Sequence, residues 1–264
     1  MLKKLIKYDF KWIFKIVLVF IILGIFCSVL GRLFSLIENS IIFGIIASIL
    51  KGASISLLAS ALINSIMRGW ARFITNQYKD ESYLTNTLPI DRRTHLLSKT
   101  ISTTIAITIS FVSLVVGLII CYYNENTIET IKQALGILSD TLNSSSTLLL
   151  VGIIMVLLLE VLFIVFVGFF GIVLGHTFNQ KKILKSLLFG LMAYGIANTI
   201  SLSFILIGSV FSDGLRGLLF GGAEEIQMSL LSGLLWFSIF VYLAYCIILY
   251  VITSKILNKG INID

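Results

Sequence analysis

The sequence predicts an all-α integral membrane protein with six transmembrane helices. Of its 264 residues, 58% are hydrophobic and 12% are charged, whereas a typical soluble domain has about 25% charged residues. Residues 16–37 and 147–175 are apolar runs that contain one charge each. Runs of more than about 18 apolar residues are typical of membrane-spanning helices. A soluble enzyme and a secreted disulfide-bonded domain are therefore excluded.

The chain before the first span is strongly basic. Lys3, Lys7, Lys11 and Lys15 recur every four residues, which predicts an amphipathic elbow helix over 1–15 that lies along the membrane interface. A plain topology signal explains the same lysines equally well.

Apolar runs then predict six spans within one transmembrane domain over 1–264. The spans are 16–37, 41–67, 99–123, 147–175, 183–210 and 229–254. Most of the 20 basic residues fall on the side that holds both ends of the chain, so both termini are predicted to be cytoplasmic. Residues 68–98 then form a cytoplasmic loop, and 124–146 and 211–228 form extracellular loops. The net charge of +7 follows from this topology and from contact with anionic membrane lipid, so no nucleic-acid partner is expected.

Motifs for catalysis are missing from the sequence. It contains no G-x-x-x-x-G-K-[ST] phosphate loop and no H-E-x-x-H zinc motif, and His95 and His176 lie in separate predicted loops. We therefore expect that the chain is not an enzyme and that it binds no metal or cofactor itself.

Small and polar residues inside the spans have two interpretations. They permit close helix packing, because small side chains let helices approach and hydroxyls can bond between them. Alternatively, part of this surface lines a moderately polar translocation path. The residues in question are Ser48, Gly52, Ser56, Ser60 and Asn64, at intervals of four on the second span, with Ser110, Ser113 and Asn198 on later spans.

Two charges lie deep within the predicted spans, Lys51 and Glu160, whereas Arg32, Lys99 and Lys185 lie nearer the span ends. Charges in lipid are costly and usually face the bundle interior or each other. Their similar predicted depth suggests an ion pair. Alternatively, Lys51 extends to the outer interface, and Glu160 is protonated or hydrogen-bonded.

The predicted loop at 68–98 alternates aromatic, aliphatic and charged residues. This pattern predicts a short helix docked on a protein surface, with Asp91 as N-cap of the following helix. The apolar side chains of Tyr83, Leu84 and Leu88 need a partner in this loop.

The same residues resemble a known family. The pattern Tyr78, Asp80-Glu81-x-Tyr83-Leu84-Thr-x-Thr87-Leu88-Pro89-Ile90 and Ser98-Lys99 resembles the first cytoplasmic loop of bacterial ATP-binding-cassette (ABC) transporter permeases of the type-two exporter class. More loosely, the chain is similar to permeases of exporters for amphipathic peptides such as the phenol-soluble modulins.

The resemblance implies a coupling helix that docks on a separate ABC ATPase subunit, which holds ATP and Mg. Two permease copies, as a homodimer or a related heterodimer, would pair around a central path. The coupling role would fall on Asp80, Glu81, Tyr83, Leu84, Leu88 and Pro89.

The sequence and this resemblance together predict a permease in the bacterial cytoplasmic membrane. It would export a hydrophobic or amphipathic substrate, with a peptide toxin or antimicrobial peptide as the best guess. A non-transporting membrane scaffold or immunity protein is the first alternative. A secondary transporter is the second, although paired Gly/Pro-broken helices typical of that class are missing.

Overall fold

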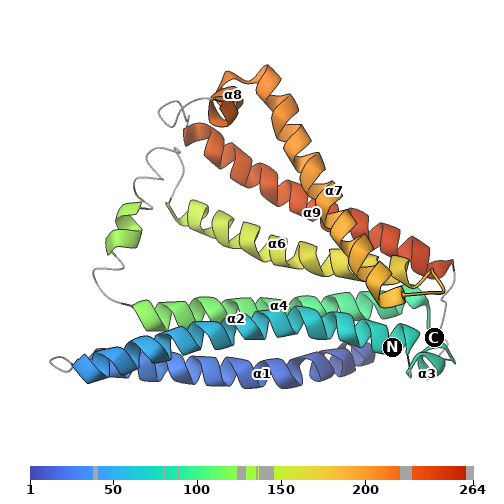
Figure 1. The fold of residues 1–264 in the computed structure, drawn as a ribbon, viewed down its shortest axis with the longest axis horizontal. Helices are drawn as coiled ribbons and strands as arrows, with labels where there is room; N and C mark the ends of the chain where they lie inside the picture. Colours follow the sequence, from blue (N-terminus) through green and yellow to red (C-terminus); the bar gives the residue numbers. More distant parts are fainter. Residues whose placement is uncertain are drawn as a thin grey trace. The chain divides into compact units, whose positions relative to one another are not determined.

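The structure, a computed structural model, is all-α and contains six candidate membrane-spanning helices. It describes residues 1–37, 41–79, 81–87, 90–123, 129–134, 136, 146–220 and 228–259. The spans are α1 (Leu2–Ser35), α2 (Ile41–Tyr78), α4 (Arg92–Tyr122), α6 (Ser146–Gly175), α7 (Lys182–Phe211) and α9 (Met228–Asn258). The short helices α3 (Ser82–Thr87) and α8 (Asp213–Phe220) and a helical segment at 129–134 lie between spans (Figure 1). The predicted all-α class and the six candidate spans are therefore confirmed, whereas the cytoplasmic orientation of the termini stays a prediction.

The chain forms two compact units. Unit 1 comprises residues 1–128 and 257–264, and unit 2 comprises residues 129–256. Unit 1 contains α1, α2, α3 and α4, and unit 2 contains α6, α7, α8 and nearly all of α9.

The N-terminal segment differs from the predicted two-part arrangement. Residues 1–15 do not form a separate elbow, because α1 runs without a break from Leu2 to Ser35. The four periodic lysines are exposed on one face, and the opposite face buries Asp9, Ile13, Val17 and Ile21 at intervals of four. These buried residues lie on one helix face on both sides of residue 15. Because the same face packs before and after that residue, the helix continues without a break.

The predicted loop at 68–98 is largely helical. The second span continues to Tyr78 instead of ending at residue 67, and α4 begins at Arg92 instead of residue 99. The added turns of α2 bury Gly69 and Phe73, so packing extends these helices beyond the apolar run that marked them in the sequence.

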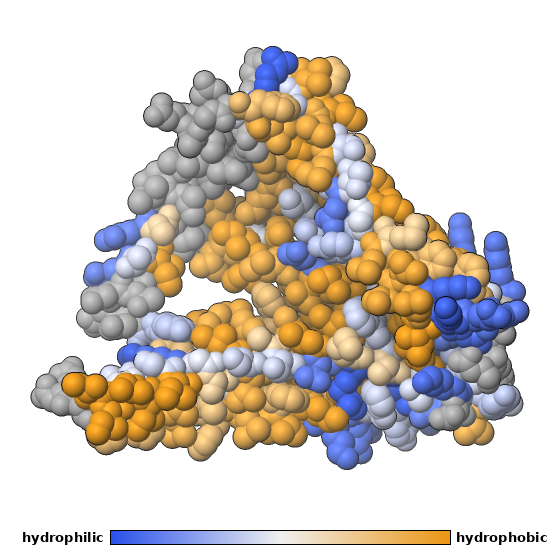
Figure 2. Space-filling model, viewed as in Figure 1, coloured by the Kyte–Doolittle hydropathy of each residue, from blue (hydrophilic) through white to orange (hydrophobic). Residues whose placement is uncertain are grey.

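Close contacts through small residues hold unit 1 together. The Leu58 side chain of α2 packs against Gly24 of α1 and Gly117 of α4, where an added Cβ would collide with it. Hydroxyl pairs also join the helices: Ser28 of α1 contacts Ser54 of α2, and Ser65 of α2 lies 2.8 Å from Ser110 of α4. In this unit, Figure 2 shows hydrophobic residues along α1 and α2 and hydrophilic residues near the end that carries α3.

Unit 2 uses a glycine contact and an aromatic core. Gly171 and Gly175 of α6 bring its backbone against Ser186 and Gly190 of α7, the close approach that a G-x-x-x-G pair permits. The α6 residue Phe163 is 2% exposed and contacts the rings of Tyr194, Tyr242 and Tyr245. The predicted extracellular loop at 211–228 contains α8, whereas most of the loop at 124–146 lies outside the described residues.

Candidate functional site

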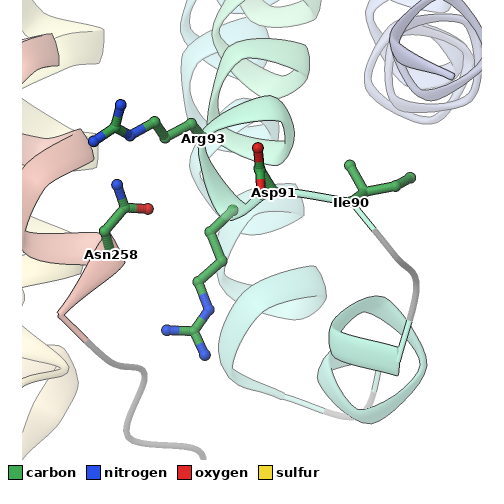
Figure 3. A pocket seen from close by; sticks show the side chains of 5 residues that line it. Ile90, Asp91, Arg93 and Asn258 are labelled. Atoms are coloured by element: carbon green, nitrogen blue, oxygen red, sulfur yellow. The ribbon is translucent and has the colours of Figure 1, made fainter.

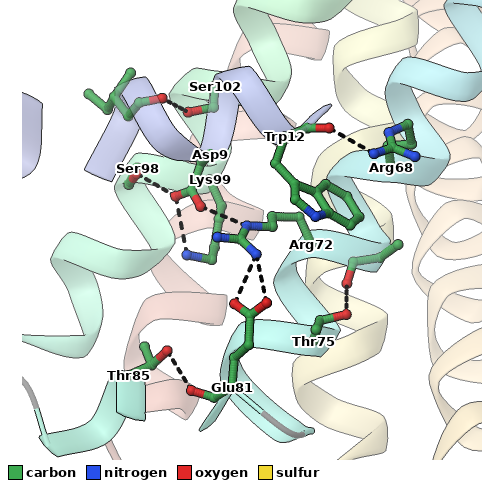
Figure 4. Close-up of polar contacts among 12 residues, drawn as sticks. Asp9, Trp12, Arg68, Arg72, Thr75, Glu81, Thr85, Ser98, Lys99 and Ser102 are labelled. Atoms are coloured by element: carbon green, nitrogen blue, oxygen red, sulfur yellow. Dashed lines mark hydrogen bonds and ion pairs between the residues drawn. The ribbon is translucent and has the colours of Figure 1, made fainter. Parts of the chain in front are cut away.

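A buried cluster of charged residues lies at the end of unit 1 that carries α3 (Figure 4). At its centre is Asp9 of α1, which is 2% exposed. One carboxylate oxygen accepts a hydrogen bond from Arg72 Nε of α2 at 3.0 Å. The other accepts from Lys99 Nζ at 3.2 Å and from Ser98 Oγ at 2.7 Å, both on α4. Asp9 thus joins all three long helices of unit 1.

Arg72 extends this cluster to α3. Its Nη1 donates to both carboxylate oxygens of Glu81, at 2.9 and 3.2 Å, and Glu81 directly precedes α3. The Glu81 side chain is 44% exposed, whereas those of Arg72 and Asp9 are 12% and 3% exposed. One guanidinium therefore connects a buried acid on α1 with a solvent-accessible acid beside α3. Charge-assisted hydrogen bonds of this kind are stronger than neutral ones.

A second arginine on α2, Arg68, binds α1 next to the charged cluster. Arg68 donates to the carbonyl oxygens of Ile13 and Trp12 at 3.1 and 2.7 Å. Its guanidinium also lies 4.2 Å from the centre of the Trp12 ring, and that of Arg72 lies 5.4 Å from it. Two guanidinium groups therefore lie near the Trp12 indole, and a cation–π interaction becomes stronger when it is shielded from water.

The two faces of α3 differ. Ser82 and Thr85 are buried, and Thr85 Oγ1 donates to the carbonyl oxygen of Glu81 at 2.8 Å. Tyr83 and Leu84, on the other face, are 65% and 74% exposed. The helix therefore packs through its small polar residues and presents its aromatic and aliphatic side chains to the outside.

A cavity of about 470 Å3 lies where α4 begins (Figure 3). It is lined by Ile90, Asp91, Arg92, Arg93 and Asn258. Arg92 Nη1 donates to the carbonyl oxygen of Leu257 at 3.4 Å. With its amide oxygen turned towards Arg93, Asn258 accepts a hydrogen bond from Nη2 at 3.0 Å. These contacts attach the last turn of α9 to the start of α4. The end of α9 therefore lies at the same end of unit 1 as the beginning of α4.

The structure describes part of the predicted coupling set. Glu81, Tyr83 and Leu84 lie at or on α3, whereas Asp80, Leu88 and Pro89 lie outside the described residues. Asp91 occupies the N-cap position of α4 as predicted, but its side chain makes no capping hydrogen bond. His95, assigned to a loop from the sequence, lies on α4 and is 3% exposed.

The small and polar residues predicted for packing or a path divide into two groups. Ser110 is buried at the contact between α2 and α4 through Ser65. Ser113 is partly buried and donates to the Ile109 carbonyl oxygen. By contrast, Ser48, Gly52 and Ser56 are exposed, and Ser60 and Asn64 are partly buried. No atom lies within 4 Å of a Cβ placed on Gly52.

Lys51 belongs to unit 1 and Glu160 to unit 2, so their pairing stays a prediction. Lys51 Nζ lies 5.8 Å from the centre of the Tyr122 ring, near the end of α4. Glu160 is partly buried on α6.

Sequence reasoning missed the charged cluster. Arg72 was interpreted as a topology signal, Lys99 as a topology signal and part of the family pattern, and Asp9 was not singled out. A usable signal exists: Asp9 is in register with Ile13, Val17 and Ile21 on the buried face of α1. An acid within an apolar stripe requires a cationic partner.

These features define the class of the chain. It is an all-α protein whose six long apolar helices suggest a multi-pass membrane protein. The chain matches no family model, no curated protein and no solved structure. Among the described residues, no group of three His, Cys, Asp or Glu side chains could hold a metal ion.

Proposed function

We propose that this protein is the membrane-spanning subunit of an ABC exporter, driven by ATP hydrolysis in a separate subunit that docks on α3. The supporting observation is the pair of exposed side chains on α3, Tyr83 and Leu84, beside an acid that is bonded to the buried cluster through Arg72. A helix with an exposed apolar face needs a partner to cover it.

The cluster offers a mechanical route from the docking helix to the spans. A shift of α3 pulls on Glu81 and therefore on Arg72, whose Nε is bonded to Asp9. Asp9 in turn contacts Ser98 and Lys99 of α4. Movement imposed by an ATPase on α3 would thus reach α1, α2 and α4 through direct contacts.

The proposed substrate is hydrophobic or amphipathic, with a peptide toxin or antimicrobial peptide as the best guess. Support comes from the scarcity of charge within the spans, because a route for small ions usually carries several intramembrane acids or bases. The protein would act in the bacterial cytoplasmic membrane with a second permease copy, and ATP and Mg would bind to the partner ATPase.

The direct test is co-expression with a candidate ATPase, chosen as a soluble protein with a phosphate-binding loop encoded beside this chain, followed by purification in nanodiscs. The absence of such a neighbour would itself count against the proposal. We expect Tyr83→Ala with Leu84→Ala to weaken ATPase association at least tenfold, because each buried side chain contributes roughly 1.5–3 kcal/mol. Fluorescence titration of the labelled ATPase measures this affinity. Ile119→Ala with Tyr123→Ala, a pair that is 55% and 58% exposed at the C-terminal end of α4, is the control. Unchanged affinity in the α3 variant would refute docking at this helix.

A second variant separates docking from transmission. Glu81→Gln leaves Tyr83 and Leu84 in place but weakens the bond to Arg72. We expect the ATPase to bind with near wild-type affinity, while substrate-dependent stimulation of ATP hydrolysis falls several-fold. Glu81→Asp, which keeps the charge, should retain part of the stimulation. Full stimulation in Glu81→Gln would show that the cluster does not transmit the movement.

A further inference from the structure

Unit 2 contains two adjoining cavities between α6, α7 and α9. Their volumes are about 420 and 290 Å3, and Phe163, Ala197 and Tyr245 line both. Because the two share these walls, one elongated molecule can occupy both. Their combined size falls within the range of roughly 300–1,000 Å3 that is typical of small-molecule sites.

The two cavities have different chemistry. Apart from Tyr245, the larger is lined only by hydrocarbon and thioether side chains, including Phe170, Met192, Ile196 and Ile248. The smaller is lined in addition by the polar residues Asn198, Ser201, Ser238 and Tyr242. No charged residue lines either cavity in the described part of unit 2. The pair is therefore suited to an uncharged molecule with one long apolar part and one polar part.

Most polar groups of the smaller cavity are bonded within the protein. The Ser201 and Tyr245 hydroxyls lie 3.0 Å apart, and both also donate to the Ala197 carbonyl oxygen at 3.0 Å. Ser238 Oγ donates to the Leu234 carbonyl oxygen at 2.7 Å. The amide nitrogen of Asn198 donates to the Tyr194 carbonyl oxygen at 3.1 Å.

Two groups remain for a ligand. The Asn198 amide oxygen and the Tyr242 hydroxyl make no hydrogen bond to any residue that the structure describes, although the Glu160 carboxylate is near enough to Tyr242 to act on it electrostatically. Asn198 lies 16 residues after Lys182 and 13 before Phe211, close to the middle of a candidate span. The Asn198 amide nitrogen is bonded to Tyr194 but the amide oxygen is not, and lipid offers an oxygen at that depth no hydrogen-bond donor.

We propose that these cavities form a binding site for an uncharged amphiphile in which a carboxamide is joined to an aliphatic chain. The Tyr242 hydroxyl donates to the carbonyl oxygen of the ligand, and the Asn198 amide oxygen accepts from its N–H. The aliphatic chain fills the larger cavity. Met192, Ile196 and Ile248 are 50–56% exposed, so a membrane-dissolved ligand can enter sideways between α7 and α9.

The choice of a carboxamide follows from the two open groups. The Asn198 oxygen only accepts, whereas the Tyr242 hydroxyl both donates and accepts. A carboxamide supplies the N–H that the Asn198 oxygen needs and a carbonyl oxygen that the Tyr242 hydroxyl can bind. An ester supplies acceptors only, and a hydrocarbon supplies neither. This inference goes beyond the proposed function, because it holds whether or not an ATPase docks on α3.

The test uses the full chain in nanodiscs and palmitamide that carries a photoreactive diazirine in its chain. We expect crosslinks, located by mass spectrometry, on α6, α7 and α9 residues that line the cavities. Unlabelled palmitamide should compete at a concentration about tenfold lower than methyl palmitate does, and hexadecane should compete least.

Two variants test the polar contacts. Asn198→Leu and Tyr242→Phe should each weaken palmitamide competition by about 2–12-fold, the range expected for one net hydrogen bond. Ser203→Ala is the matched control, because its hydroxyl bonds to Thr199 on the exposed side of α7 and lines neither cavity.

Three results would overturn the proposal. They are uniform labelling of all six spans, equal competition by hexadecane and palmitamide, and wild-type competition in both polar variants. Circular dichroism and gel filtration of each variant establish that it is folded before competition is measured. Since no ATPase is present in the assay, these outcomes do not depend on the exporter proposal.

Discussion

Units 1 and 2 each contain three candidate spans, but different interactions hold them together. Unit 1 combines the Leu58 contact with a buried ionic cluster that joins α1, α2 and α4. Unit 2 relies on glycine contacts of α6 with α7 and, through Gly152 and Leu235, with α9, and on rings around Phe163. The buried share of the apolar part is 28%, 17% and 39% in α1, α2 and α4 of unit 1, against 28%, 11% and 6% in α6, α7 and α9 of unit 2. Contacts within unit 1 therefore determine how its helices pack. In unit 2, most of the helix surface stays available to lipid or another molecule.

The largest expected effect comes from breaking the ionic cluster of unit 1. Asp9→Asn leaves Lys99 buried beside a neutral side chain, and loss of one partner of a buried ion pair costs about 3–5 kcal/mol. Adding Lys99→Met should restore much of this loss, since it removes the stranded charge. Thermal unfolding in detergent measures both variants. Additive losses in the double variant would contradict a direct Asp9–Lys99 interaction.

An intermediate effect is expected from adding one methyl group to the glycine contact of unit 2. A Cβ on Gly171 would lie 2.5 Å from the Ser186 carbonyl oxygen, so Gly171→Ala should destabilise the protein by about 1–3 kcal/mol through overpacking.

Gly52→Ala is the matched control in unit 1, where a Cβ has open space. Helix propensity favours alanine there by up to about 1 kcal/mol, so thermal stability should be unchanged or higher. Loss of stability in Gly52→Ala would instead reveal that this exposed ridge packs against another helix.

The smallest effect concerns Lys51 and Tyr122. A cation near an aromatic ring at an exposed site contributes about 0.5–1 kcal/mol, and a double-mutant cycle with Lys51→Met and Tyr122→Leu should give a coupling energy of that size. Thermal unfolding supplies the four measurements. Zero coupling here, with coupling between Lys51→Met and Glu160→Gln, would favour the ion pair predicted from the sequence.

The spans could be predicted from the sequence because long apolar runs directly reflect lipid exposure. Their ends could not, since α2 continues to Tyr78 through turns that pack on protein and carry charge. Tyr83 and Leu84 were predicted to lie on a short helix because apolar side chains stand out in a polar segment. Arg72 and Lys99 did not stand out, because a lysine or arginine that pairs with a buried acid looks the same in sequence as one that faces head groups.

Three cations of α2 also bear on how this helix could sit in a bilayer. Lys51 is 17 residues from Arg68 and 21 from Arg72 on one continuous helix, which at about 1.5 Å per residue is about 26 and about 32 Å. The hydrocarbon core of a bilayer is about 30 Å thick. With Lys51 at one boundary, the two arginines would fall on either side of the other boundary. Arg68, on the hydrocarbon side, is the one that donates to backbone carbonyl oxygens of α1, whereas Arg72 pairs with Asp9 and Glu81.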